Sequence, residues 1–330
     1  MRYILIISSK ANPKTLSMLD DAIDYVNTHD PELRAKIELR YTEYLGHSAD
    51  LAIELSEQYG DKITIVACGG DGTIHEIANA LAFRKTPMIC LPFGTGNDFV
   101  KTMIPHWKEW DTVHFLMNLD KVKVKPIDLI RIDSYDIMGG HLKNWSGYMN
   151  NVASVGLDTE VQFKAKTLVR TNDTPFNRKT AYIKSAVKSL FGKRAHDFKF
   201  KLELENGEIY ESKNSKYTLM SICNAKFYGD GFCPAPDADP ADGIADVCVI
   251  DDVNIFRAIP LLLAYRTGTH KGKAGVHMFR ATSGIIESED PSFQLMGNFD
   301  GEDFFGHRIR FEVHRKALNI GYFPVDGYKS

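Results

Sequence analysis

The sequence has no apolar run long enough to cross a membrane. A spanning helix needs about 20 consecutive apolar residues, and the nearest candidate, residues 258–265, is much shorter. Residues 3–7 are apolar and follow Arg2, but this run is too short for the apolar core of a secretion signal, and Lys10 comes soon after it. We therefore expect a first β-strand there, and any contact with a membrane to be peripheral.

Paired cysteines and an excess of positive charge are also missing. The five cysteines form an odd set without a CxxC spacing, and several stand in strand-like runs where a thiol acts as a small hydrophobic group, which fits the reduced cytoplasm. His47, His75 and His270 have no metal-ligand spacing. The formal net charge of -3 argues against a nucleic-acid-binding protein with a broad basic surface.

The first part of the chain alternates strand and helix patterns. With 330 residues the sequence exceeds what one hydrophobic core usually holds, so we expect two domains. Strands are expected at residues 4–8, 35–41, 63–67 and 88–91, of which 4–8, 63–67 and 88–91 are short apolar runs, and helical patterns occupy residues 15–27, 48–59 and 112–118. This alternation predicts a parallel sheet with helices on both faces, which binds ligands beyond the carboxyl ends of its strands.

After residue 120 the pattern changes to a period of two. Residues 121–125 and 198–205 alternate in this way, and the second run leads into an Asn206-Gly207 turn. Such hairpins predict an antiparallel β-sandwich domain, with helices inserted at about 159–169, 180–191 and 254–265. We place this domain at residues 121–317, after an α/β domain at 1–120, and expect the tail 318–330 to pack back on the first domain.

Two glycine-rich turns follow neighbouring strands of the first domain. Their sequences are Gly69-Gly70-Asp71-Gly72-Thr73 and Gly94-Thr95-Gly96-Asn97-Asp98. Glycine lets backbone N–H groups close around a phosphate, and the helix that begins after each turn adds unpaired donors. One such turn would more often reflect tight packing alone. Two turns that each carry a carboxylate indicate a nucleoside triphosphate site with a bridging metal ion.

Together the two turns resemble the diacylglycerol kinase catalytic-domain family, which includes bacterial lipid kinases and the sphingosine and ceramide kinases. The first turn alone is shared with NAD kinases and phosphofructokinases. Further segments resemble family motifs in family order, at residues 41–49, 124–129, 149–158, 224–231, 236–243 and 299–302. The resemblance implies an α/β nucleotide-binding domain like that of NAD kinases and diacylglycerol kinases, followed by a β-sandwich domain for the lipid substrate.

The resemblance implies that ATP and Mg²⁺ bind at the two turns. The residues assigned to the nucleotide are Ser8, Thr42, Gly69, Gly70, Asp71, Gly72, Thr73, Gly94, Thr95, Gly96, Asn97 and Asp98. Asp71, Asp98 and Asp128 are implied to hold the nucleotide-bound Mg²⁺, in part through water, since this ion gives up its hydration reluctantly. An aspartate at the start of a helix, such as Asp98, is also typical of an N-cap.

Asp300 and Glu302 match the catalytic pair of the family. The resemblance implies that Asp300 accepts the proton of the attacking hydroxyl group and that Glu302 raises its basicity. Asp71 is the alternative base, because some family members are described in that way. The local sequence by itself predicts only an Asp-Gly hairpin turn.

Asp239, Asp242 and the backbone carbonyl of Ile244 resemble a structural Mg²⁺ site of the family. Oxygen ligands gathered in a tight loop suit a hard cation. A polar Asp-Pro turn explains the same residues equally well.

The loop after the first strand departs from the family pattern. The family usually has Asn-Pro-x-x-Gly there, and this chain has Ser8-Ser9-Lys10-Ala11-Asn12. Asparagine tolerates the left-handed backbone conformation and serine hydroxyls bond phosphate, so we expect the loop to keep its shape. The departure also leaves a non-catalytic nucleotide-binding homologue as an alternative.

The lipid side is marked by an apolar helix at residues 253–265. Arg266, His270, Lys271 and Lys273 follow it, so the segment either docks on a bilayer or packs in the core beside a solvated loop. Residues 170–179 are a second candidate, as a mobile lip.

We therefore expect a cytoplasmic, peripherally membrane-associated lipid kinase. Its ATP would lie in an interdomain cleft, and its partner would be a lipid substrate at the membrane surface. Diacylglycerol, which would give phosphatidic acid, is the leading substrate. The alternative substrates are a sphingoid base, phosphatidylglycerol or a soluble hydroxylated metabolite. The sequence does not decide between a monomer and a homodimer.

Overall fold

The computed structural model describes residues 1–94, 96–104, 111–136, 142–171, 174, 180–181, 184–185, 188–189, 196–229 and 231–324. The chain divides into two compact units. The first comprises Met1–Ile127 and the chain from Lys316 onward, and the second comprises Asp128–Arg315. The sequence patterns place these boundaries after residues 120 and 317.

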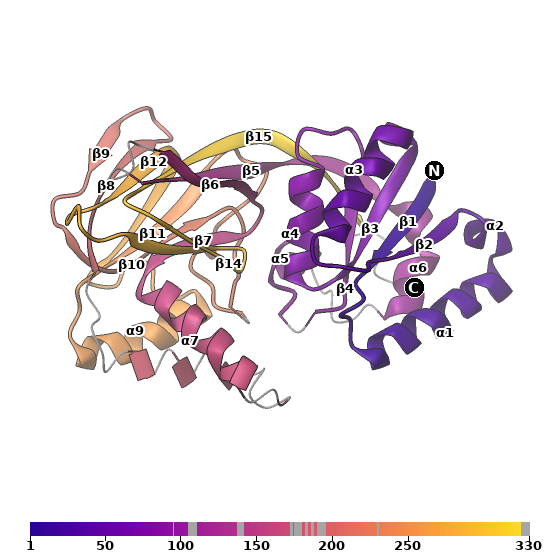
Figure 1. Ribbon diagram of the computed structural model, residues 1–330, viewed down its shortest axis with the longest axis horizontal. Coiled ribbons are helices and arrows are strands. Elements are labelled where there is room, and N and C mark those ends of the chain that lie inside the picture. The colour runs from indigo at the N-terminus through magenta and orange to yellow at the C-terminus, as the bar shows by residue number, and fades with distance from the viewer. Residues whose placement is uncertain are drawn as a thin grey trace. The chain divides into compact units, whose positions relative to one another are not determined.

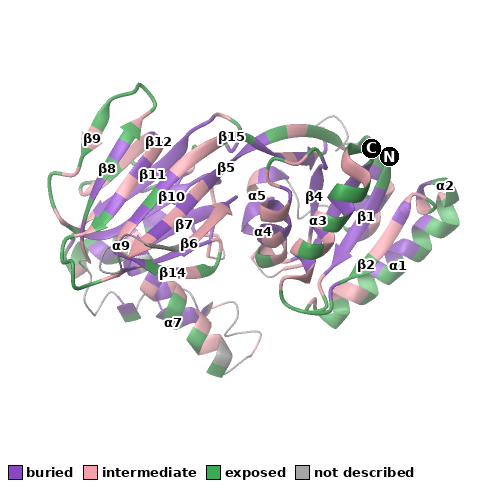
Figure 2. Ribbon diagram, turned by 45° about the horizontal axis from the view of Figure 1, so that its top comes forward, coloured by how far each residue is buried: buried purple, intermediate pink, exposed green. Residues whose placement is uncertain are grey.

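A parallel sheet forms the centre of the first unit. Its strands are β1 (Arg2–Ile7), β2 (Ile37–Tyr41), β3 (Ile63–Gly69) and β4 (Met88–Pro92), in the order β4-β3-β1-β2. The end of β15 (Arg308–Tyr322) extends the sheet by pairing in parallel with β4. All seven residues of β3 are buried, as expected for a parallel strand with helices on both faces (Figure 2).

Helices cover both faces of this sheet. They are α1 (Pro13–His29), α2 (Pro31–Arg34), α3 (His47–Tyr59), α4 (Asp71–Ala80), α5 (Asp98–Met103) and α6 (Thr112–Met117), with 3-10 turns at Gly60–Lys62 and Leu119–Lys121. Helix α1 packs against α6, and α3 packs against α4. Figure 1 shows the two pairs on opposite faces of the sheet, which confirms the α/β fold of this part of the chain.

Antiparallel strands form the second unit. They are β5 (Lys123–Asp136), β6 (Leu142–Met149), β7 (Val152–Gly156), β8 (His196–Leu204), β9 (Ile209–Glu211), β10 (Lys216–Cys223), β11 (Ala245–Asp251), β12 (Val276–Ser288), β13 (Leu295–Phe299), β14 (Glu302–Gly306) and the first part of β15. The main order is β14-β13-β7-β10-β11-β12-β15. Strand β8 pairs with β10 and β12, so the strands wrap around a core that includes Phe198, Phe299 and Phe311.

Helices α7 (Leu157–Thr171) and α9 (Ile255–Thr267) lie over a second core of this unit. Figure 1 shows both helices on the same side of the strands. The antiparallel domain with inserted helices is thus confirmed, although half of the helix expected at 180–191 lies outside the described residues, as do most of residues 170–179. Within the described ranges, no helix is long and apolar enough to span a membrane. All five cysteines are buried and free.

Candidate active site

The loops that follow the four parallel strands lie along one edge of the first unit. Parallel strands all end at the same edge, so residues distant in sequence meet there. Backbone hydrogen bonds join neighbouring loops. The N–H of Ser8 donates to the carbonyl of Cys68 at 3.0 Å, and the N–H of Phe93 donates to the carbonyl of Gly69 at 3.2 Å. The loops that carry the described residues expected to bind the nucleotide are therefore neighbours.

Some glycines of the two turns have no room for a side chain, because the chain packs closely within and between the turns. A Cβ atom on Gly94 would lie 2.5 Å from the Cα of Gly70, and one on Gly69 would lie 2.4 Å from the Oγ1 of Thr73. Both distances are shorter than real Cβ atoms show. These glycines therefore have a packing role whatever else they bind. Gly72 differs, because a Cβ there would meet nothing within 4 Å.

Asn97 closes the second turn. Its backbone is left-handed, with φ 50°, and its side chain accepts a hydrogen bond from the N–H of Gly94 at 2.9 Å and donates one to the carbonyl of Gly94 at 2.8 Å. The side chain is buried and both of its polar ends are used. Asn97 thus shapes the turn. Thr95, also expected to bind the nucleotide, lies outside the described residues.

The carboxylates of Asp71 and Asp98 converge beside Gly96. A Cβ on Gly96 would lie 3.0 Å from Oδ2 of Asp71 and 3.4 Å from Oδ2 of Asp98. The other oxygens have partners: Asp71 Oδ1 accepts from the N–H of Phe99 at 3.3 Å, and the Nζ of Lys101 lies 2.7 Å from Asp98 Oδ1. Asn97, and not Asp98, is the N-cap of α5.

The electrostatics of this pair suit a divalent cation. Burial and then the negative charge of Asp98 raise the pKa of Asp71 to about 6, and hydrogen bonds from the backbone of Phe99 and Asp98 oppose this rise. Two converging carboxylate oxygens are hard ligands that Mg²⁺ accepts, with water and phosphate oxygens completing its coordination. The residues present therefore fit one nucleotide-bound Mg²⁺ ion.

The loop after β1 differs from its expected shape. Asn12 is extended, with φ -61° and ψ 135°, and its side chain accepts a hydrogen bond from the N–H of Lys14 at 2.9 Å as the N-cap of α1. The expected left-handed asparagine is therefore wrong, because capping the helix requires an extended backbone. Thr42 supports the same loop, since its buried Oγ1 accepts a hydrogen bond from the N–H of Ser9 at 3.0 Å. The Oγ of Ser8 accepts one from the N–H of Lys10 at 3.4 Å.

Asp300 lies in the second unit, in the hairpin turn between β13 and β14. Both turn residues have positive φ, 44° at Asp300 and 95° at Gly301, as in a type I′ turn. The carboxylate of Asp300 accepts hydrogen bonds from the N–H groups of Asn150 at 2.8 Å, Asn151 at 3.1 Å and Val152 at 3.0 Å. Three consecutive backbone donors thus fix the position of its oxygens.

The side chain of Glu302 is exposed and forms no hydrogen bond or ion pair with any residue that the structure describes. The neighbouring Asp303 is the engaged carboxylate: Lys166 Nζ lies 3.0 Å from it, and the same lysine donates to the carbonyl of Gly301. The sequence alone did not single out Lys166 or Asp303. Only the pairing of α7 with the hairpin reveals them.

Asp128 also belongs to the second unit, and the structure groups it with the loop at 239–244. Its buried carboxylate accepts a hydrogen bond from the N–H of Gly243 at 2.6 Å, and its own N–H donates to the carbonyl of Pro240 at 2.6 Å. The side-chain amide of Asn224 then donates to the carbonyls of Asp128 at 2.9 Å and Asn150 at 3.1 Å. Asn224, which the sequence motifs contain but did not mark, thereby joins Asp128 to the turn that holds Asp300.

The loop at 239–244 is closed by its own hydrogen bonds. Asp239 Oδ1 accepts from the N–H of Ala241 at 3.0 Å, and Asp242 Oδ1 accepts from the N–H of Ile244 at 3.0 Å. The guanidinium group of Arg280 lies 2.9 Å from Asp242 Oδ2. Across the described ranges, no three His, Cys, Asp or Glu side chains cluster so as to hold a metal ion.

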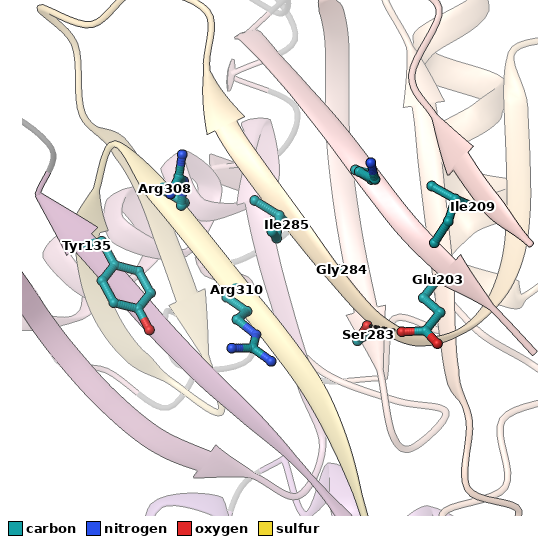
Figure 3. A pocket seen from close by; sticks show the side chains of 9 residues that line it. Tyr135, Glu203, Ile209, Ser283, Gly284, Ile285, Arg308 and Arg310 are labelled. Atoms are coloured by element: carbon teal, nitrogen blue, oxygen red, sulfur yellow. Dashed lines mark hydrogen bonds between the residues drawn. The ribbon is translucent and has the colours of Figure 1, made fainter. Parts of the chain in front are cut away.

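A hollow on the surface of the second unit contains none of the expected site residues. Exposed and half-buried side chains, mainly of β8, β12 and β15, line it, among them Glu203, Ser283, Ile285, Arg308 and Arg310 (Figure 3). Its cations are paired, since Arg308 lies 2.6 Å from Glu287 and Arg310 lies 2.8 Å from Glu312. We assign no role to this hollow.

Comparisons with known proteins agree with this architecture. Residues 3–132 match the family described as diacylglycerol kinase catalytic domain, and residues 151–321 match the family described as YegS C-terminal NAD kinase beta sandwich-like domain. The chain belongs to the YegS/diacylglycerol kinase family of lipid kinases. Membership of this kinase family implies use of a nucleotide.

Individual relatives in this lipid kinase family are distant in sequence. A protein of Shewanella frigidimarina (strain NCIMB 400) named "Probable lipid kinase YegS-like" is 27% identical, over 83% of this chain and 81% of its own length. One of the same name from Pectobacterium atrosepticum is 27% identical over 95% and 97%. A solved diacylglycerol kinase from Bacillus anthracis str. Sterne has a TM-score of 0.62 at 17% identity, covering 97% of this chain and 96% of that chain. At this identity, the likeness shows the fold alone.

Proposed function

We propose that this lipid kinase transfers the γ-phosphoryl group of ATP to the hydroxyl group of diacylglycerol, giving phosphatidic acid. The observation that carries the nucleotide part is the contact between two glycine turns with converging carboxylates, Asp71 and Asp98, beside Gly96. The name of the family and those of its relatives support a lipid acceptor.

The first unit supplies the groups that would bind the nucleotide. Backbone N–H groups of the turns and the start of α4 would face the phosphates, and open space beside Gly72 lets the backbone approach closely. When bound, Mg²⁺ would spread the negative charge of the phosphates. Asp71 and Asp98 would hold that ion, in part through water, and Lys101 would keep Asp98 in place.

The acceptor step needs one proton to move. As the lipid oxygen bonds to the γ-phosphorus, the bond from that phosphorus to the oxygen of the β-phosphate breaks, ADP leaves, and the hydroxyl proton is released. We assign Asp300 as its acceptor, because three backbone donors fix the position of this carboxylate and because the family resemblance assigns this role to it. Asp71, whose pKa is raised to about 6, is the alternative base.

A second, structural Mg²⁺ ion would have to compete with Arg280. Both oxygens of Asp242 already have partners, the N–H of Ile244 and the guanidinium group of Arg280. Asp239 is exposed and caps the turn of its own loop. The residues present therefore do not fit such an ion without movement of the arginine.

The function is tested by incubating the protein with γ-labelled ATP and a lipid extract, in parallel with a pool of soluble metabolites. We expect label in the organic phase, in a product that migrates with phosphatidic acid, and none when Asp71 is replaced by Asn. Label in a phosphorylated sphingoid base or phosphatidylglycerol would replace diacylglycerol as the substrate. Label confined to the aqueous metabolites, or ATP binding without any transfer, would contradict the proposal.

A further inference from the structure

Helix α9 carries a row of exposed apolar side chains. Phe256 is 86% exposed, Leu263 63% and Ile259 46%, and their spacing of three and four residues places them on one face of the helix. The opposite face is buried through Ala258, Leu261, Ala264 and Tyr265 in the core of the second unit. Core packing therefore accounts for half of this helix only, and a contiguous exposed apolar face marks a contact surface.

Basic residues occur within this helix and shortly after it. Helix α9 contains Arg257 and Arg266 and no acidic residue, and Lys273 follows it. Arg257 and Lys273 are exposed, and neither forms an ion pair with a described residue. Arg266 lies over the ring of Phe232 at 5.4 Å, and it forms no ion pair with a described carboxylate. Asp252 is the one exposed acidic residue directly before the helix.

Two basic residues expected to contribute do not. His270 is fully buried, and burial lowers its pKa, so its ring stays neutral near pH 7. Lys271 forms an ion pair with Asp237. The basic side chains of α9 and the following loop that have no described carboxylate partner are therefore Arg257, Arg266 and Lys273.

Helix α7 extends the same side of the unit. Both helices pack into one core, through Val161 of α7 and Leu261 of α9, and Figure 1 shows them next to each other. Phe163 of α7 is 53% exposed. An apolar contact made by α9 could thus continue onto α7.

We propose that the face of α9 formed by Phe256, Ile259 and Leu263 docks on a bilayer that contains anionic lipids. The inference rests on the proposed function, because an enzyme with a lipid acceptor must reach a bilayer, and it names the surface that does so. Apolar side chains of an interfacial helix enter the boundary between headgroups and acyl chains, and arginine and lysine beside them attract anionic headgroups. A second copy of the chain fits less well, since three side chains expose less than the about 800 Å² per partner that a stable dimer buries.

Co-sedimentation with vesicles of phosphatidylcholine, with and without phosphatidylglycerol, tests this surface. Phe256→Ala and Leu263→Ala should each weaken binding about tenfold. Phe256→Trp keeps a large apolar side chain and should bind the vesicles as the wild type does. Arg257→Gln and Lys273→Gln should each weaken binding to the anionic vesicles about fivefold, with little effect on neutral ones. Ile209→Ala, which removes an apolar side chain that is 55% exposed on β9, is the matched control and should bind as the wild type.

The outcomes separate this inference from the proposed function. Binding of the Phe256 and Leu263 variants at wild-type strength, or no binding of the wild type, would overturn the docking surface even if the protein phosphorylates diacylglycerol. Binding that depends on α9 would support the surface even if transfer to lipid fails. A wild-type dimer that the two variants convert to monomer in sedimentation velocity, with vesicle binding unchanged, would assign the face to a second copy and overturn the inference. Phosphorylation of a dispersed short-chain diacylglycerol should stay unchanged in every variant.

Discussion

Gly94 contacts Gly70 so closely that a Cβ atom on Gly94 would lie 2.5 Å from the Cα of Gly70. Because that neighbour is backbone, it cannot move aside as a flexible side chain would. We expect Gly94→Ala to push the two turns apart, to lower the stability of the protein by about 1–3 kcal/mol and to abolish ATP binding. Thermal unfolding and calorimetric titration with ATP would measure both effects.

Gly72→Ala is the matched substitution, because a Cβ there meets nothing within 4 Å and the residue lies inside α4. Alanine is the better helix former, so we expect the protein to be more stable by about 0.5–1 kcal/mol. If the backbone of Gly72 approaches the phosphates, the ATP affinity should fall nonetheless. Unchanged ATP affinity would show that the turn binds no phosphate at this position.

Asp71 should make both nucleotide binding and stability depend on pH. Its folded-state pKa of about 6 lies above the ordinary value of 3.8, so the folded protein binds this proton more tightly than the unfolded chain does. The contribution of Asp71 to the free energy of unfolding should therefore increase as the pH falls from about 6 to about 4. The affinity for Mg²⁺-ATP should fall over the same range, because the protonated carboxyl is a poor ligand.

Asp71→Asn should remove this pH dependence. We expect the variant to unfold at a higher temperature than the wild type at pH 7.5, by a stabilisation of about 1–3 kcal/mol, and to show almost no advantage near pH 4. It should also lose phosphoryl transfer. Equal unfolding temperatures at pH 7.5 would contradict the raised pKa of Asp71, which we attribute to burial and then to the negative charge of Asp98.

Asp300→Asn should reduce both stability and transfer. The amide offers one acceptor oxygen, so part of the set of donors from Asn150, Asn151 and Val152 loses its partner, which costs about 1–3 kcal/mol. If Asp300 is also the proton acceptor, kcat per folded molecule should fall about 100-fold or more. A folded variant with wild-type kcat would show that Asp300 has only a structural role, which is to hold the backbone at residues 150–152.

Glu302→Gln is the control for that measurement. The side chain of Glu302 is exposed and forms no hydrogen bond or ion pair within the described residues. The unfolding temperature of the variant should therefore equal that of the wild type. We expect kcat to fall much less than in the Asp300 variant. A loss of kcat as large as that of Asp300→Asn would instead support the catalytic pair that the resemblance implies.

Arg280→Gln tests whether the loop at 239–244 binds a metal ion. Removing the guanidinium group frees Asp242 Oδ2, so millimolar Mg²⁺ should raise the unfolding temperature of the variant more than that of the wild type. Arg308→Gln removes another half-buried arginine, paired with Glu287, and should show no such response. An equal response of Arg280→Gln and the wild type to Mg²⁺ would exclude a metal site that competes with Arg280.

The architecture of the first unit could be predicted because its signals are local. Three of the parallel strands, β1, β3 and β4, are short apolar runs, and β3 is buried along its whole length. The glycine turns also lie directly after their strands. Residues distant in sequence meet there only because all parallel strands end at the same edge.

The arrangement of the second unit could not be predicted in the same way. The contacts of Asp300 with Asn150 and of Asp128 with Gly243 join residues more than one hundred positions apart, and strand register decides them. Local patterns also could not distinguish the exposed Lys273 from the buried His270, or Glu302 from the ion-paired Asp303. The shape of the loop after β1 depended on Asn12 capping a helix, which competes with the left-handed conformation expected there.

Strand β15 has a consequence for how the protein is made. Ile309 and Phe311 lie in the core of the second unit, and Ile320 of the same strand pairs with Met88 of the first. A ribosome therefore finishes the whole second unit before it supplies the residues that cover the edge of β4. Until then the nascent first unit exposes an unpaired strand edge, on which another chain can add.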